Sequence, residues 1–187
     1  MSNYFKYFPT IDYNNRSVVN ITKRTKIVED IFGDPFVFLP YTIRNDDRPE
    51  HIAEFYYGSQ DKVWLVYFAN NIMDMYGEWP LSSIDFEENF KKKYAEKSGA
   101  TGYAVLAWGQ NKTITDNILY YQNIANTETT INTFTFENGS FIVEAEWKAI
   151  RYYDYETIIN DNKRNIYLID NRFSDKFETD LKAQMNG

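Results

Sequence analysis

The stretch LPYTIRNDDRPEHIAEFYYGSQDKVWLVYFANNI, residues 39–72, predicts a strand followed by two helices. Asp47, with Glu50 three positions later, has the spacing of a capping box, and Pro49 lies in the first helical turn, where a missing N–H does no harm. The second helix, about 61–70, is apolar on most of its circumference and should be the more buried of the two. We expect these three elements to form one small packed block.

Length and composition limit the classes of protein to which this chain can belong. Its 187 residues are enough for one good hydrophobic core with elaborations. The formal charge of −7 argues against a general nucleic-acid binder, which usually presents a basic face. No cysteine is present, which excludes disulfides, thiolate catalysis and zinc ribbons. Sixteen tyrosines and fourteen phenylalanines suit a core and also suit protein interfaces.

The sequence carries no targeting or membrane signal. The N-terminus, MSNYFKYFPTIDYNN, lacks a basic stretch followed by an apolar run, and nowhere do eighteen apolar residues stand together. We therefore expect a soluble protein that a signal peptide does not export. The missing cysteines fit assembly in a reducing cytoplasm.

The first half of the chain differs from the second in its proline content. All five prolines fall in the first eighty residues, which predicts a boundary after about Leu81. Ahead of the block, residues 11–19 predict a hairpin about Asn14-Asn15, a pair that tolerates left-handed turn conformations. Residues 27–32 repeat their apolar side chains at helical spacing, and Gly33 is a natural stop for that helix.

Beyond residue 82 the chain reads as a helix followed by strands. Residues 84–94 predict the helix, with lysines in its second half, where the helix dipole favours them. YAVLAW, 103–108, predicts a buried strand, and TINTFTFENGSFIVEAEWKAI, 130–150, predicts a hairpin about Asn138-Gly139. NILYYQNI, 117–124, stays ambiguous between strand and helix. Four apolar side chains at a spacing of four predict an amphipathic terminal helix: Phe173, Phe177, Leu181 and Met185. This stripe can pack on the chain's own sheet or into a partner's groove, and we favour the chain's own sheet.

Few residues offer catalytic chemistry. His51 is the only histidine, and it lies beside Glu50 and Glu54 on the polar side of the first helix, which predicts a solvated side chain outside any catalytic triad. No phosphate loop, calcium loop or zinc set of His and Cys is present. Paired carboxylates of a glycosidase stay open, because twenty-seven Asp and Glu residues offer many chance pairs. We expect no catalytic, cofactor or metal site.

Part of the opening stretch resembles the start of a LysM module. The residues concerned are Tyr41-Thr42-Ile43-Arg44, Ile52-Ala53, Tyr57-Gly58 and Ala69-Asn70. Such modules begin with a strand, continue with an acidic turn where Gly-Asp-Thr is usual, and run a helix that ends in Tyr-Gly. Here the turn reads Asn45-Asp46-Asp47-Arg48 instead. In sugar-binding members the loop after the first strand helps to form the groove, so at this turn we expect a glycan groove to have been lost.

A wider resemblance spans nearly the whole chain. An ordered set of segments is similar to a baseplate wedge protein of contractile-tailed bacteriophages with a LysM-like core: YFKYFPTIDYNN, NITKR, RPEHIAEFYYGS, VWLVYFANNIMDMYGEWPLS, FKKKY and YYDYETIINDNKRNIYLID. This resemblance implies a structural subunit without enzymatic activity. Such a subunit is assembled in the host cytoplasm, resides in the virion tail baseplate and joins neighbouring wedges in the inner baseplate.

The resemblance also implies which residues carry family signatures. The variant of the acidic turn matches Arg48, Pro49 and Glu50. The second helix and an exit strand match Trp64, Asn70, Asp74, Trp79 and Pro80. The C-terminal signature matches Tyr155, Glu156, Asn160, Lys163, Arg164 and Ile166. Taken without the resemblance, Trp64 is a core residue, Trp79-Pro80 is a turn on the core, and Lys163-Arg164 is a solvated pair. The resemblance alone implies an interface role for these residues, and for Lys163-Arg164 the two interpretations stay open.

Together these inferences predict an α+β protein in four parts. They are an N-terminal arm with a hairpin and a short helix, 1–35; a LysM-like βααβ core, 36–82; a connecting helix, 83–98; and an antiparallel β-rich C-terminal subdomain closed by a terminal helix, 99–187.

The expected partners are proteins. The resemblance implies other baseplate wedge proteins and neighbouring wedges, with hub or tail-tube initiator proteins as further candidates, and no nucleic acid, membrane or small-molecule substrate. The N-terminal arm suits an acidic partner because it is locally basic, with Lys6, Arg16, Lys23, Arg24 and Lys26. Two other functions stay open. One is a LysM-type protein that binds peptidoglycan or chitin oligomers, and the other, ranked last for want of a catalytic constellation, is a cell-wall hydrolase.

Overall fold

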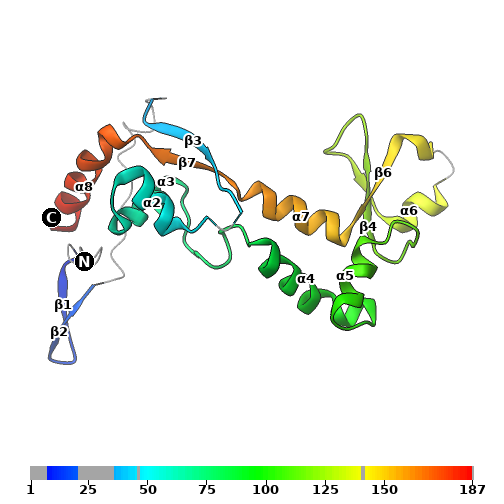
Figure 1. Cartoon of the computed structure of the whole chain (residues 1–187), viewed down its shortest axis with the longest axis horizontal. Helices are drawn as coiled ribbons and strands as arrows, with labels where there is room; N and C mark the ends of the chain where they lie inside the picture. The colour runs from blue at the N-terminus through cyan, green and yellow to red at the C-terminus, as the bar shows by residue number, and fades with distance from the viewer. Residues whose placement is uncertain (1–7, 21–35, 46, 140–141, 187) are drawn as a thin grey trace. The chain divides into compact units, whose positions relative to one another are not determined.

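The computed structural model describes residues 8–20, 36–45, 47–139 and 142–186 (Figure 1). The chain forms two compact units, Met1–Trp79 with Arg164–Gly187 (unit 1) and Pro80–Lys163 (unit 2), which we treat separately. The helix expected at 27–32 lies outside the described residues. Within the described ranges no helix is long and apolar enough to cross a membrane.

Unit 1 is a two-stranded sheet packed with two helices. Strand β3, Phe38–Thr42, pairs antiparallel with β7, Asn165–Ile169, and helices α2, Pro49–Tyr57, and α3, Val63–Ala69, lie beside it (Figure 1). A short 3-10 turn, Gln60–Lys62, connects the helices. The block of one strand and two helices expected from the opening stretch is therefore confirmed. Its buried core includes Val37, Ile43, Ile52, Ala53, Leu65, Val66, Ile166, Leu168 and Ile169.

The second strand of this block does not follow the second helix. Residues 70–82 contain no strand, so the exit strand expected at Trp79 and Pro80 was wrong. Instead β7 arrives from the far end of the chain and sets Asn165 opposite Thr42. Asn71 takes a left-handed φ of 53°, which turns the chain away from an extended path. The β-rich subdomain expected at 99–187 also differs from this division, because 164–187 packs with unit 1.

The turn before α2 has a different capping arrangement from the one expected. The Asp47 carboxylate accepts hydrogen bonds from the Arg44 N–H at 2.9 Å and from the Tyr41 hydroxyl at 3.3 Å. The N-cap position belongs to Arg48, which makes no side-chain capping bond, so the predicted capping box was wrong. Pro49 does occupy the start of the helix, as predicted. Asp47 therefore stabilises the turn that begins at Arg44, and it does not cap α2.

The hairpin predicted near the N-terminus is confirmed. Strand β1, Thr10–Tyr13, pairs with β2, Arg16–Val19. Asn14 and Asn15 connect them with φ values of 52° and 57°. Two successive left-handed residues are what a two-residue turn needs to match the twist of its strands, and Asn accepts that conformation more readily than most residues.

The terminal helix packs on the chain itself, as predicted. Helix α8, Asn171–Asn186, buries Phe177 in the core of unit 1. One turn further on, Leu181 is buried against Phe8, with Trp64 packed beside them. The described part of the apolar stripe is therefore used within unit 1.

Unit 2 combines four α-helices with a small sheet in its described residues. The helices are α4, Ser83–Ser98; α5, Tyr103–Gln110; α6, Thr133–Asn138; and α7, Tyr152–Asn162. The sheet has the order β5-β4-β6, from Thr130–Ile131, Ile118–Asn123 and Trp147–Arg151, and β6 follows a 3-10 turn, Glu144–Glu146. The ambiguous segment at 117–124 is thus mostly strand β4. An aromatic core joins α4, α5 and α7: Phe90, Tyr94, Val105, Leu106, Trp108, Tyr152 and Tyr153.

The strand predicted for YAVLAW was wrong, because this segment is helix α5. A six-residue apolar run fits a buried strand and a buried helix equally well by periodicity. In the fold, Val105, Leu106 and Gly109 face inward at helical spacing. Gly109 lies so close to α4 that an added Cβ would be 2.6 Å from the Phe90 ring. This close helix contact, which no local pattern encodes, decides the structure.

The hairpin predicted about Asn138-Gly139 was also wrong, because residues 133–138 form helix α6. The Asn132 side chain accepts the Thr135 N–H at 2.7 Å and caps the helix. Phe136 then stacks on Tyr121 of β4, with ring centroids 3.6 Å apart. Gly139 has a φ of −81°, so the left-handed turn expected there is not made. The C-terminal half is accordingly mixed rather than β-rich.

Candidate functional site

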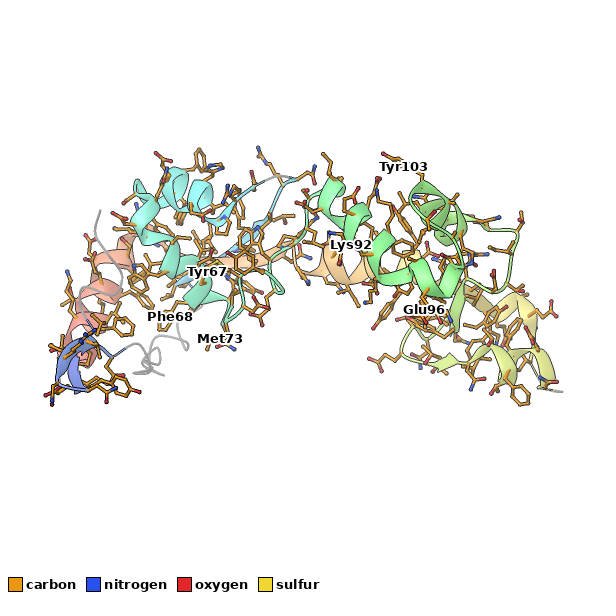
Figure 2. The ribbon with its side chains drawn as sticks, turned by 90° about the horizontal axis from the view of Figure 1, so that it is seen from below. Tyr67, Phe68, Met73, Lys92, Glu96 and Tyr103 are labelled. Atoms are coloured by element: carbon orange, nitrogen blue, oxygen red, sulfur yellow. The ribbon has the colours of Figure 1, made fainter. Side chains whose placement is uncertain are left out.

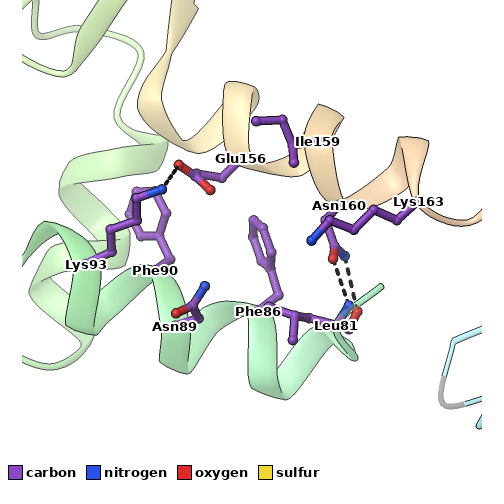
Figure 3. Close-up of a pocket in the computed structure, with 9 residues that line it drawn as sticks. All are labelled: Leu81, Phe86, Asn89, Phe90, Lys93, Glu156, Ile159, Asn160 and Lys163. Carbon is purple, nitrogen blue, oxygen red and sulfur yellow. Dashed lines mark hydrogen bonds and ion pairs between the residues drawn. The ribbon is translucent and has the colours of Figure 1, made fainter. Parts of the chain in front are cut away.

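Three residues of the C-terminal signature gather along one side of α7, the third at the position directly after the helix. Glu156, Asn160 and Lys163 are spaced four and three residues apart, so they line one side of the helix. With α4 they surround a cavity of about 50 Å³ (Figure 3). A volume of this size has room for a few water molecules. The cavity is lined by Leu81, Phe86, Asn89, Phe90, Lys93, Glu156, Ile159, Asn160 and Lys163.

Glu156 ties α7 to α4. Its carboxylate lies 2.7 Å from the Lys93 ammonium and accepts the Tyr94 hydroxyl at 2.6 Å. Burial raises the pKa of Tyr94, and the hydrogen bond to Glu156 raises it further, so the phenol stays protonated and keeps donating. The Glu156 side chain is 13% exposed. Both of its neighbours are on α4, so the carboxylate acts as an internal link between the two helices.

Asn160 acts as a backbone partner for a segment far away in the sequence. Its side-chain carbonyl accepts the Leu81 N–H at 2.7 Å, and its amide donates to the Leu81 carbonyl at 3.1 Å (Figure 3). The side chain is buried, with 7% of the residue exposed. The pair reproduces the two-bond pattern of neighbouring antiparallel strands. Asn160 thereby fixes the segment that leads into α4.

Asn70 also bonds through its side chain to the backbone of a distant residue, in unit 1. Its side-chain carbonyl accepts the Tyr167 N–H at 2.7 Å, and its amide donates to the Tyr167 carbonyl at 2.8 Å. The amide also donates to Val66 at 2.8 Å, which satisfies a carbonyl near the end of α3. Asn70 therefore joins the end of a helix to the outer edge of β7.

Trp79 connects the two loops at the end of the unit 1 block. Its indole N–H donates to the Asp47 carbonyl at 3.1 Å, and its ring meets Tyr67 edge-on at 6.4 Å between centroids. Burial raises the pKa of Tyr67 to about 12, with a smaller contribution from the Glu50 carboxylate. Pro80, the next residue, is buried as well. The sequence prediction of a turn packed on the core fits this position.

Arg48 and Glu50 form the exposed corner of the same turn. The Arg48 guanidinium Nε lies 3.7 Å from the Glu50 carboxylate, and the Arg48 side chain is 71% exposed. Ion pairs at this exposure contribute little to stability. Arg48 is therefore available to a partner, whereas Pro49 behind it is buried.

The other signature residues lie in several different settings. Trp64 is partly buried on α3, Tyr155 meets Tyr120 edge-on, and Ile166 is in the core. The Arg164 carbonyl accepts the Ile43 N–H at 2.8 Å, which continues the β3–β7 ladder. Most of the signature is thus internal, and its exposed members are Arg48 and Asp74.

Sequence reasoning missed two polar residues that hold loops in place. Asn117 is fully buried, and its amide donates to the carbonyls of Trp108 and Asn111, both at 2.7 Å, which closes the end of α5. The Glu78 carboxylate accepts the N–H groups of Met73 and Asp74 at 2.6 and 2.8 Å. Their partners depend on the fold, and neither residue belongs to a local motif that could have identified it.

The loop that Glu78 fixes, residues 71–78, displays apolar side chains to solvent. Tyr76 is 86% exposed and Met73 is 69% exposed. Figure 2 shows Met73 on the same side of unit 1 as Tyr67 and Phe68 of α3. The Asp74 carboxylate accepts the Tyr76 N–H at 3.0 Å, so the loop that carries these side chains is internally bonded. We call residues 71–78 the display loop.

Acidic and histidine side chains do not converge as metal ligands do. In the described ranges no group of three or more His, Asp or Glu residues could hold a metal ion. His51 is exposed on α2, as the sequence predicted.

Comparison with protein-family models gives the class of the protein, which is a baseplate protein of bacteriophages. The matching model is described as Base plate wedge protein 53 and covers residues 3–181, so the chain belongs to this family. It therefore has a structural role in the virion, at the tail baseplate, among other baseplate components. Among curated proteins, none matches the chain.

Proposed function

We propose that this chain joins neighbouring wedges during assembly of the inner baseplate. The observation that carries the proposal is the distribution of exposed large apolar side chains over both units. Unit 1 exposes Phe55 and Tyr76, and unit 2 exposes Ile84, Tyr103 and Phe134, each at least 74%. Aromatic side chains are typical anchors of protein interfaces, because they bury a large area at a low entropy cost. A chain with anchors on two separate units suits contacts with more than one neighbour.

The display loop supports this role because its anchors are held in place before any partner binds. Glu78 and Asp74 bond three backbone N–H groups within the loop. A preorganised surface loses less conformational entropy on association. We therefore expect Tyr76 on this loop to contribute strongly to the binding energy of an interface. Hub or tail-tube initiator proteins are further partners in this proposal.

The rival proposal, binding of peptidoglycan or chitin oligomers, would use the loop after Ile43 and the segment before Trp79. The Trp79 indole donates to the Asp47 carbonyl at 3.1 Å, which ties these two loops together. A sugar between them would have to break this bond, and a buried donor without a partner is expensive. We therefore favour the loss of the glycan groove.

Wedge joining is tested with a Tyr76→Ala variant. The phage genome lacks the gene for this chain, and a plasmid in the host supplies the variant. Complete baseplates and single wedges are separated by sedimentation. We expect the variant to fold like wild type and to reduce the yield of complete baseplates by about tenfold or more, as truncation of an interface anchor does. Lys92→Ala is the matched control, because Lys92 is an exposed side chain on α4 (Figure 2). Wild-type yields from both Tyr76→Ala and Phe55→Ala would refute the proposal.

A calorimetric titration with N-acetylglucosamine oligomers tests the rival. We expect no saturable heat from the wild-type chain. Binding in the micromolar range would favour the glycan function over wedge joining.

A further inference from the structure

The small sheets of this chain differ in how their outer edges are closed. In an antiparallel pair, residues alternate between positions whose N–H and C=O point at the partner strand and positions whose groups point outward. Outward groups on an edge strand can pair with a strand from another chain. The register of each sheet therefore shows which backbone groups point outward, away from the partner strand.

Both edges of the β3–β7 sheet are closed at their centre. Ile43 bonds to Arg164 and Asp170 bonds to Val37, both at 2.8 Å, so the pair midway between them, Pro40 with Tyr167, points outward. Pro40 has no N–H to offer on the β3 edge. On the β7 edge, both outward groups of Tyr167 are taken by the Asn70 side chain.

Among the residues that the structure describes, no group closes either edge of the β1–β2 hairpin in this way. The Asn20 N–H donates to the Pro9 carbonyl at 2.8 Å, which marks that pair as facing inward. By alternation, Thr10 and Asp12 point outward on β1, and Ser17 and Val19 point outward on β2. All eight strand residues are exposed, and neither strand contains proline. A two-stranded hairpin with both faces in water is marginally stable at best, so an added strand would stabilise it.

The β2 edge is the freer of the two. Phe8, just before β1, is buried with Leu181 of α8, so the β1 side of the hairpin begins against the chain's own helix. Arg16 starts β2, and the first 27 residues carry five basic side chains and one acidic one, a local charge of +4 on a chain of −7. Within the described ranges, the β2 edge is thus unpaired, and it lies in a segment whose sequence is basic.

We propose that the β2 edge, Arg16–Val19, adds as a strand to an unpaired, acidic strand edge of another baseplate protein. This inference rests on the proposed structural role. Backbone pairing supplies affinity in such strand addition, and complementary charge helps to set the register. A second copy of this chain is a poor occupant. Among the described strands, β3 and β7 are closed at their centre, β4 is paired on both sides and β5 has two residues. Strand β6 carries Lys148 and Arg151, which would repel Arg16, and β1 begins against α8 and offers a single acidic side chain, Asp12.

Proline substitution tests the edge without removing a side-chain contact. In Ser17→Pro the lost N–H points outward, so the hairpin keeps its own ladder while the edge loses a donor. Thr10→Pro makes the same change on the opposite edge, and Ser17→Ala removes only the hydroxyl. Each full-length variant is supplied from a plasmid to phage that lacks the gene, and its amount in purified baseplates is measured. We expect Ser17→Pro to lower incorporation by at least about tenfold, and both controls to stay near wild type.

A photo-crosslinking residue at position 18 of the otherwise wild-type chain gives a second, independent readout. A crosslink to another baseplate protein supports the proposal, and a crosslink to a second copy overturns it. Wild-type incorporation of Ser17→Pro, or equal loss with Thr10→Pro, also overturns it. If the wild-type chain is absent from baseplates, the proposed function fails, whereas incorporation of wild type and Ser17→Pro alike refutes only the strand addition.

Discussion

Asn160→Ala separates a structural role of the C-terminal signature from an interface role. In the fold, this side chain gives both of its polar groups to Leu81, at 2.7 and 3.1 Å. Alanine removes both hydrogen bonds and leaves the Leu81 N–H and C=O without these partners. With 7% of Asn160 exposed, water has little access to replace it. We expect the isolated protein to lose stability.

The magnitude follows from three terms. Two hydrogen bonds at a net value of about 1 kcal/mol each remove about 2 kcal/mol. Incomplete replacement of these two bonds by water adds about 1 kcal/mol. Alanine is the better helix former and returns about 0.5 kcal/mol on α7. The expected net loss in the free energy of unfolding is therefore about 2 to 3 kcal/mol.

Urea denaturation followed by circular dichroism and tryptophan fluorescence measures this loss. Asn162→Ala is the matched control, because it makes the same substitution at an exposed position of the same helix, and it should change the free energy by less than about 0.5 kcal/mol. Asn160→Asp should destabilise at least as much as alanine, since it cannot donate to Leu81 and buries a charge. A loss below about 0.5 kcal/mol for Asn160→Ala, together with defective baseplate assembly, would refute the structural reading and support a direct contact.

Four further outcomes are expected. Asn117→Ala should lower the free energy of unfolding by about 2 to 3 kcal/mol in the same assay, because it removes the two hydrogen bonds that the buried Asn117 amide donates to the Trp108 and Asn111 carbonyls at the end of α5. Gly109→Ala should lower the free energy of unfolding by about 1 to 3 kcal/mol, because the new Cβ would lie 2.6 Å from the buried Phe90 ring. The Tyr67 pKa of about 12 lies above its unfolded value of roughly 10, so its contribution to stability is present below pH 10 and is lost as the pH rises towards 12. Ultraviolet titration of a Tyr67→Phe variant against wild type detects the missing late-titrating phenol. A fragment of residues 36–82 should show no cooperative thermal transition, because its strand β3 lacks β7.

The parts of the fold that sequence predicted correctly are those whose signals are local. The Asn14-Asn15 pair fixes a two-residue turn regardless of its surroundings. Gly58, with a φ of 74°, ends α2 where the pattern placed the end. The apolar stripe through Phe177 and Leu181 identified α8 by its period alone. Each of these elements is determined by residues within a few positions of one another.

The elements that sequence predicted wrongly depend on distant contacts. Alternation of Phe134 and Phe136 with polar residues is typical of a strand, yet the cap at Asn132 starts a helix there and Phe136 finds Tyr121. Over six residues the sequence pattern does not distinguish a strand from a helix, and contacts with other elements determine which of the two forms.

The candidate site could likewise be predicted only in part from the sequence. Resemblance to the family pointed to Asn70, Trp79 and Asn160, but their chemical roles came from the fold. Asn70 meets Tyr167 across 97 positions, and Asn160 meets Leu81 across 79. A single asparagine in a sequence does not reveal whose backbone it will bond.

One of these long-range contacts, between Asn160 and Leu81, helps to explain how β3 of unit 1 pairs with β7, which is distant in the sequence. Thr42 and Asn165 pair across 123 positions, and closing a loop of that length has an entropy cost that grows with its logarithm. Asn160 and Leu81 lie near the two ends of unit 2 and bond across 79 positions. Once unit 2 has folded, the loop that β3 and β7 must close shortens from 123 to about 44 residues, which lowers the closure cost by about 1 kcal/mol. Asn160 therefore stabilises its own unit and also brings together the chain ends from which unit 1 completes its sheet.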